Sequence, residues 1–201
     1  MPSLDDIFRY FNGVWRMMLG RRDGLDYLDI SAEDFWSSFY AIVVALPPLF
    51  ASWVSAAANL TAGREEAGFR LAIILRLAFV DIAAWVIPLV LVGLLARTIG
   101  IASRYAPYVI ATNWGTALVS WFFAPITLLQ LFVPDSADVT TLFAFIMFGA
   151  SVVLGYRLTH VALQRPHVVV APFFACVFFG TLFLTVLLQQ IFRIGFAHQA
   201  Y

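Results

Sequence analysis

Two ionisable residues, Arg76 and Asp81, lie inside an otherwise apolar run at residues 71–96. A charged side chain near the centre of a bilayer costs about 2.5–3.5 kcal/mol on insertion scales, so such a residue is paired, neutralised or functional. A carboxyl group at this depth suits an ion or proton path, and it also serves as a hydrogen-bonding group that fixes helix packing. Because Asp81 is a single carboxylate, we expect the packing role and keep the proton path as the alternative.

The two residues are five positions apart, which is about 140° around a helix, so they do not face each other. Arg76 lies near one end of the run, where its long side chain can reach the membrane surface. Asp81 therefore needs a partner on another helix. Hydroxyl groups at a matching depth occur at Ser120, Ser151, Thr181 and Thr185.

Few other residues suggest chemistry. Asn113 is expected to hydrogen-bond across helices, with a place in a vestibule as the alternative. His160 and His167 lack the further ligands that a metal site needs, so we expect no metal. The sequence holds no Ser/His/Asp grouping, no phosphate-binding Gly-rich loop and no H-E-x-x-H motif. We therefore expect no enzyme activity and no cofactor.

Composition indicates an integral membrane protein. Hydrophobic residues make up 62% of the 201 and charged residues 12%, whereas about a quarter of the residues in soluble domains are charged. A net charge of zero argues against a nucleic-acid partner. The apolar runs are long and unbroken, which favours helices over a membrane barrel. The fold class expected is therefore all-α and polytopic.

Five transmembrane helices are predicted from the apolar runs, at residues 39–58, 71–96, 108–132, 139–158 and 168–192. Pro47 and Pro48 lie in the middle of the first. Each removes a backbone donor, so the pair should kink the helix and leave carbonyl groups that a neighbour must satisfy. We expect a structural bend, and a hinge beside a cavity is the alternative.

An amphipathic helix is predicted before these spans. Ser3 and Asp6 form a capping box at its start, and Gly20 follows its end. Apolar residues recur at spacings of three and four, at Leu4, Ile7, Phe8, Phe11, Val14, Trp15 and Met18. Phe8, Phe11, Trp15 and Arg16 are the candidates for contact with the headgroup layer. The alternative is that this face packs on the protein's own spans or on a neighbouring subunit.

Residues 21–30 read as a charged turn and a surface linker, and Ser31 with Asp34 predicts a second helix start. The chain is thus expected to divide into a cytoplasmic segment, 1–30, and a transmembrane domain, 31–201. Orientation follows from the arginines. If the N-terminus is cytoplasmic, that side carries eight of them, against three outside: Arg9, Arg16, Arg21, Arg22, Arg97, Arg104, Arg157 and Arg165 against Arg64, Arg70 and Arg193. We expect a bacterial inner-membrane protein with its C-terminus in the periplasm.

This order of parts resembles the Yip family of small membrane proteins: an amphipathic N-terminal segment, then five closely spaced spans with prolines in the early ones. The stretch SAEDFWSSFYAIVVALPPLF at residues 31–50 is also similar to a segment of small alphaproteobacterial membrane proteins of unknown function. Eukaryotic members of the Yip family are linked to Rab GTPases and vesicle membranes, so the resemblance implies a role of this kind. Neither resemblance carries a motif of functional residues.

We therefore expect a non-enzymatic scaffold or accessory subunit that binds the lipid bilayer and other membrane proteins or a second copy of itself. The alternative is a small transporter or channel with Asp81 near the path. No internal repeat is evident, and five spans without one fit poorly with the inverted repeats of many secondary transporters.

Overall fold

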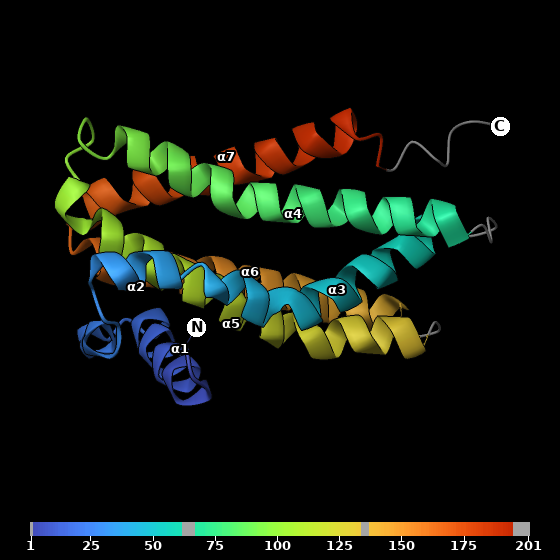
Figure 1. The fold of residues 1–201 in the computed structure, drawn as a ribbon, viewed down its shortest axis with the longest axis horizontal. Helices are drawn as coiled ribbons and strands as arrows, with labels where there is room; N and C mark the ends of the chain where they lie inside the picture. The colour runs from blue at the N-terminus through green and yellow to red at the C-terminus, as the bar shows by residue number, and fades with distance from the viewer. Residues whose placement is uncertain (1, 62–66, 134–136, 195–201) are drawn as a thin grey trace.

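Helices are the only regular secondary structure in the part that the structure, a computed structural model, describes: residues 2–61, 67–133 and 137–194 (Figure 1). The elements are α1 (Leu4–Met18), η1 (Arg22–Tyr27), α2 (Ala32–Ser37), α3 (Tyr40–Leu60), α4 (Ala67–Leu95), η2 (Ala102–Arg104), α5 (Tyr105–Phe132), α6 (Ala137–Leu163) and α7 (His167–Ile191). Five stretches are long and apolar enough to cross a membrane: Ala32–Leu60, Ala67–Leu95, Ala102–Phe132, Val139–Leu163 and His167–Ile191. Five such helices are compatible with a multi-pass membrane protein.

The helices extend beyond several of the predicted spans. The first candidate span begins at Ala32, since Ser31 accepts a hydrogen bond from the backbone N–H of Asp34 and starts α2. The fourth candidate span continues to Leu163, past the predicted end at residue 158. An α-helix forms its own backbone hydrogen bonds, so it can continue beyond the apolar run into water. Residues 62–66, which include Arg64, lie outside the described part, as do residues 1, 134–136 and 195–201.

The long helices form two groups (Figure 1). In one group α5 packs against both α3 and α6, and in the other α4 packs against α7. We call the end of the bundle where α1, α2 and η2 lie the α1 end, and the opposite end the far end. At the far end α3 turns away from α5 and meets α4.

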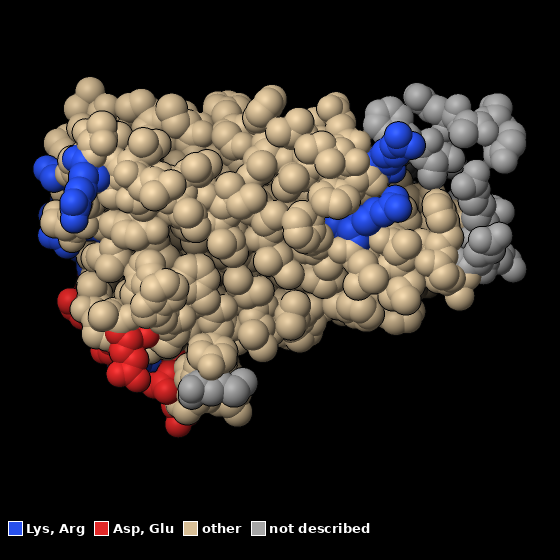
Figure 2. Space-filling model, turned by 45° about the horizontal axis from the view of Figure 1, so that its top comes forward, with Lys and Arg blue, Asp and Glu red and all other residues tan. Residues whose placement is uncertain are grey.

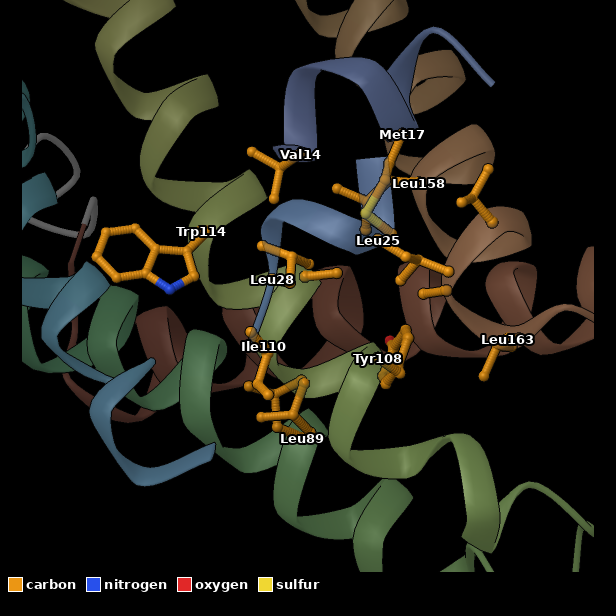
Figure 3. Close-up of a cluster of buried hydrophobic side chains, with 14 of the residues drawn as sticks. Val14, Met17, Leu25, Leu28, Leu89, Tyr108, Ile110, Trp114, Leu158 and Leu163 are labelled. Carbon is orange, nitrogen blue, oxygen red and sulfur yellow. The ribbon is translucent and has the colours of Figure 1, made fainter. Parts of the chain in front are cut away.

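Helix α1 is part of the hydrophobic core. Its buried side chains Tyr10, Val14, Met17 and Met18 join a cluster that includes residues of α4, α5, α6 and α7. Figure 3 shows Val14 and Met17 beside Leu25 and Leu28, with Trp114 and Leu158 on the neighbouring helices. The N-terminal segment 1–30 therefore shares its core with the spans.

The segment after residue 24 is predicted to be a surface linker, and this prediction is wrong because two of its side chains are buried. Leu25 and Leu28 are only 8% and 4% exposed, because η1 folds back beneath α1. This close approach depends on two glycines. A Cβ on Gly13 would lie 2.9 Å from the carbonyl oxygen of Gly24, and a Cβ on Gly24 would lie 2.5 Å from the carbonyl oxygen of Gly13.

Charged residues are absent from the middle of the molecule on the face in Figure 2. They gather at its two ends and leave a broad uncharged belt between them. Such a belt matches the hydrocarbon layer of a bilayer, which charged side chains avoid.

Candidate functional site

Asp81 pairs with a tryptophan on the preceding span. The indole Nε1 of Trp53 on α3 donates a hydrogen bond of 2.7 Å to Asp81 Oδ2 on α4. The Trp53 side chain is buried beside Ala57, Ile73 and Leu77 in a second apolar cluster at the far end. The intramembrane carboxyl group therefore joins two helices.

The hydroxyl groups that the sequence suggested as partners of Asp81 bond elsewhere. Each donates to a backbone carbonyl of its own helix, three or four residues earlier: Ser120 to Thr116, Ser151 to Phe148, Thr181 to Val177 and Thr185 to Thr181. Such local bonds satisfy a hydroxyl group without a neighbouring helix. The expectation that Asp81 bonds to one of them is thus wrong.

Arg76 connects α4 to the end of α7. Its Nη1 donates a 3.2 Å hydrogen bond to the backbone carbonyl of Phe192, the C-cap residue of α7. The last carbonyls of a helix lack partners within it, and they lie at the negative end of the helix dipole. The Arg76 guanidinium therefore supplies the missing hydrogen-bond donor and places a positive charge at the negative end of the helix dipole.

Asn113 lies at the centre of a buried hydrogen-bond network. Its Oδ1 accepts a 2.9 Å bond from Trp85 Nε1 on α4, and its Nδ2 donates at 2.8 Å to the Oγ of Ser38 after α2. Ser38 in turn donates to the carbonyl of Phe35. The network links α2, α4 and α5, as the expected cross-helix role requires.

Pro47 and Pro48 occupy the point where α3 changes partners. Before them Ala41 and Ala45 pack in the α1-end cluster, and after them Trp53 and Ala57 pack in the far-end cluster. Pro48 has no N–H to bond to the carbonyl of Val44, four residues earlier.

A tryptophan on α5 supplies the donor that Pro48 lacks. Trp121 Nε1 donates to the carbonyl oxygen of Val44 at 3.1 Å. A side chain of a neighbouring helix thus replaces the missing backbone bond, which is the role of such contacts at proline in membrane helices.

The cavities of the described residues include two between helices of the bundle. One, of about 280 Å³, is lined by residues of α5, α6 and α7, including Ser151. The other, of about 700 Å³, lies between α4 and α7. Neither is lined by Asp81, Pro47 or Pro48.

The four candidate interfacial residues of α1 have different surroundings. Phe11 packs on Trp114 with ring centroids 6.0 Å apart, and Trp15 packs edge-on against Phe122 at 5.5 Å. Phe8 is 69% exposed. Arg16 instead faces η1.

Ion pairs tie α1 to the segment that follows it. Arg16 bonds to Asp23 at 2.6 Å, and Arg9 bonds to Asp29 at 2.6 Å. The hydrogen bond from Arg21, with a further one from Arg16, lowers the pKa of Asp23 below its usual value. The hydrogen bond to Asp29 raises the pKa of Arg9, so this guanidinium stays charged.

The histidines lie against each other. The rings of His160 and His167 stack at 4.0 Å, and the Tyr156 hydroxyl group contacts His167 Nδ1 at 2.6 Å. Within the described residues no three His, Cys, Asp or Glu side chains are grouped so that they could hold a metal ion.

Comparison of the chain with protein-family models, with curated proteins and with solved structures found no match.

Proposed function

We propose that this chain is a non-enzymatic integral membrane protein that acts as a scaffold or accessory subunit. The observation that carries the proposal is that its intramembrane polar groups are engaged in contacts between helices. Asp81 accepts from Trp53, Asn113 accepts from Trp85, and Arg76 donates to the end of α7. Transport pathways place ionisable groups along a cavity, whereas Asp81 lines neither cavity described above.

A second observation indicates where this scaffold meets lipid or a partner. Four apolar side chains of α1 are exposed and share one side of the helix: Leu4, Phe8, Trp15 and Leu19. They adjoin the packed face formed by Phe11, Val14 and Met18, so α1 is apolar over more of its circumference than the bundle covers. We call these four residues the α1 stripe.

The α1 stripe lies at the level of the spans. Trp15 contacts Phe122, which is 17 residues into α5 and therefore roughly 25 Å along that helix. Part of the stripe thus borders the apolar belt itself, where its apolar side chains suit contact with acyl chains or with a partner helix. In this proposal one face of α1 packs on the spans, and the adjacent face binds lipid or a partner helix.

The location proposed is the bacterial inner membrane, with α1 on the cytoplasmic side and the end of α7 on the periplasmic side. The excess of arginines at the α1 end supports this orientation, since Arg97, Arg104, Arg157 and Arg165 all lie at or near that end. The order of a cytoplasmic amphipathic helix and five spans also supports the Yip-like assignment as a proposal.

Affinity purification from native membranes in mild detergent, followed by mass spectrometry, tests the scaffold function. We expect a stoichiometric companion that a Phe8→Asp variant loses. Phe8→Leu is the matched control, because it keeps an apolar side chain at the same exposed position of the α1 stripe. If the chain purifies without a companion, and a normally folded Asp81→Asn variant loses an ion flux measured in proteoliposomes, transport replaces the scaffold proposal.

A further inference from the structure

The larger cavity is an apolar groove between α4 and α7 at the α1 end. Its walls include Leu91, Leu95 and Ile99 on one side and Val169, Phe173 and Leu184 on the other. Thr181 also lines it, but the Thr181 hydroxyl group is already bonded to the carbonyl of Val177. The groove holds about 700 Å³. We call it the α4–α7 groove.

The groove is at least as long as the hydrocarbon layer of one leaflet is deep. Its lining on α7 runs from Val169, near the first turn, to Leu184. Fifteen residues of helix rise roughly 22 Å, and one leaflet contributes roughly 15 Å of hydrocarbon. An acyl chain that enters from the α1 end therefore fits along its length.

Cations border the same end of the groove. Arg97 lies in the turn between the lining residues Leu95 and Ile99. Arg165 Nη2 donates to the carbonyl of Gly100 at 2.9 Å, which holds its guanidinium against that turn. Arg104 follows in η2.

These cations have no acidic partner in the described part of the chain. All four ion pairs found there lie between residues 6 and 29. The sequence has no Asp or Glu between Asp81 and Asp135, and none after Asp138. An anion at the mouth of the groove would therefore meet uncompensated positive charge.

We propose that the α4–α7 groove binds one anionic phospholipid, with an acyl chain between the helices and the headgroup phosphate at Arg165 and Arg97. Basic pockets between transmembrane helices on the cytoplasmic side recognise lipid headgroups in this way. The combination of a leaflet-deep apolar groove with cations at one end only favours a lipid over a second copy of the chain. The inference does not depend on the scaffold function.

Native mass spectrometry of the full chain in detergent tests the proposal, with phosphatidylglycerol and phosphatidylcholine of identical acyl chains as probes. We expect one retained lipid and a preference for phosphatidylglycerol. Arg165→Gln should reduce that preference about fivefold, the effect of one arginine near an anionic lipid surface. Arg157→Gln on α6 removes the same charge away from the groove lining and should leave the preference unchanged.

A second pair of variants tests the groove itself. Gly180 lines it, and a Cβ there would meet open space, so Gly180→Phe places a ring in the groove. Gly149 on α6 also faces open space but is outside the groove lining. We expect Gly180→Phe to lose the retained lipid and Gly149→Phe to keep it, with equal elution volumes and melting temperatures showing that both fold.

Three outcomes would overturn the proposal. One is equal retention of the two lipids by the wild-type chain. Another is displacement of the lipid by inorganic phosphate alone, which would indicate a phosphate site without an acyl-chain groove. The third is a dimer that Gly180→Phe dissociates, which would assign the groove to a second copy.

Discussion

The indole N–H of Trp53 and the carboxylate of Asp81 meet at 2.7 Å between α3 and α4, although 28 residues separate them in the chain. Without Asp81, the indole N–H of the buried Trp53 would need another acceptor in an apolar cluster. Without Trp53, the carboxylate would lose a donor at membrane depth.

Asp81→Asn should keep this contact, because an amide oxygen also accepts from an indole N–H. We expect the melting temperature of the detergent-purified variant to stay close to that of the wild type. Asp81→Leu should lower it. In a double-mutant cycle with Trp53→Phe, the coupling free energy should be about 0.6 kcal/mol, the average for such bonds in membranes. A zero coupling would mean that the pair does not hold α3 to α4.

Trp121→Phe should destabilise the bundle by about 0.5–1.5 kcal/mol, because it leaves the carbonyl of Val44 without the donor that replaces the missing N–H of Pro48. Pro48→Ala restores that N–H. In the Pro48→Ala background the same Trp121→Phe change should therefore cost much less, measured as thermal or denaturant unfolding in detergent. An equal cost in both backgrounds would separate Trp121 from the proline.

Gly24→Ala should loosen the contact between α1 and η1. The added methyl group would lie 2.5 Å from the carbonyl oxygen of Gly13, and backbone cannot move aside as a flexible side chain can. Overpacking of this kind costs about 1–3 kcal/mol. Hydrogen exchange in residues 4–28 should rise. Gly68→Ala, where a Cβ would meet open space, is the control and should have no such effect.

Acid should also weaken the contact between α1 and η1. The pKa of Asp23 lies below its ordinary value of 3.8 in the folded chain, chiefly through the hydrogen bond from Arg21. Its stabilising contribution is therefore complete above that ordinary pKa and is lost as the pH falls through the lower, folded-state pKa. The protection factors of amide hydrogen exchange in α1 and η1, which are corrected for the intrinsic pH dependence of exchange, should be unchanged from about pH 8 to 5 and should fall below about pH 4. A chain with Asp23→Asn should have lower protection factors already at neutral pH and a smaller fall in acid.

The sequence was sufficient for elements whose signals are local. The capping box of Ser3 and Asp6 and the spacing of apolar residues predict α1, and the apolar runs predict five long helices. Contacts between helices depend on how each helix is rotated about its axis. A sequence that is apolar on all sides of a helix does not show which side faces which neighbour. The partners of Asp81 and Asn113 were therefore missed, as was the burial of Leu25 and Leu28.

One signal for those pairings was present in the sequence. Three of the six tryptophans, Trp53, Trp85 and Trp121, donate to acceptors on other helices. An indole N–H in hydrocarbon requires an acceptor, and acceptors are few there: Asp81, Asn113 and the carbonyls that prolines release. Matching scarce donors to scarce acceptors at equal depth would have suggested these contacts.

Five crossings, with the α1 end in the cytoplasm, are the central claim of this account. Single cysteines at Ser103 in η2 and at Asn59 near the end of α3 test it directly, in a chain with Cys176→Ala, by labelling intact cells with a membrane-impermeant maleimide. We expect Asn59→Cys to be labelled from outside and Ser103→Cys only after the membrane is permeabilised. Labelling of both positions from the same side, or of Ser103→Cys alone from outside, would contradict the account.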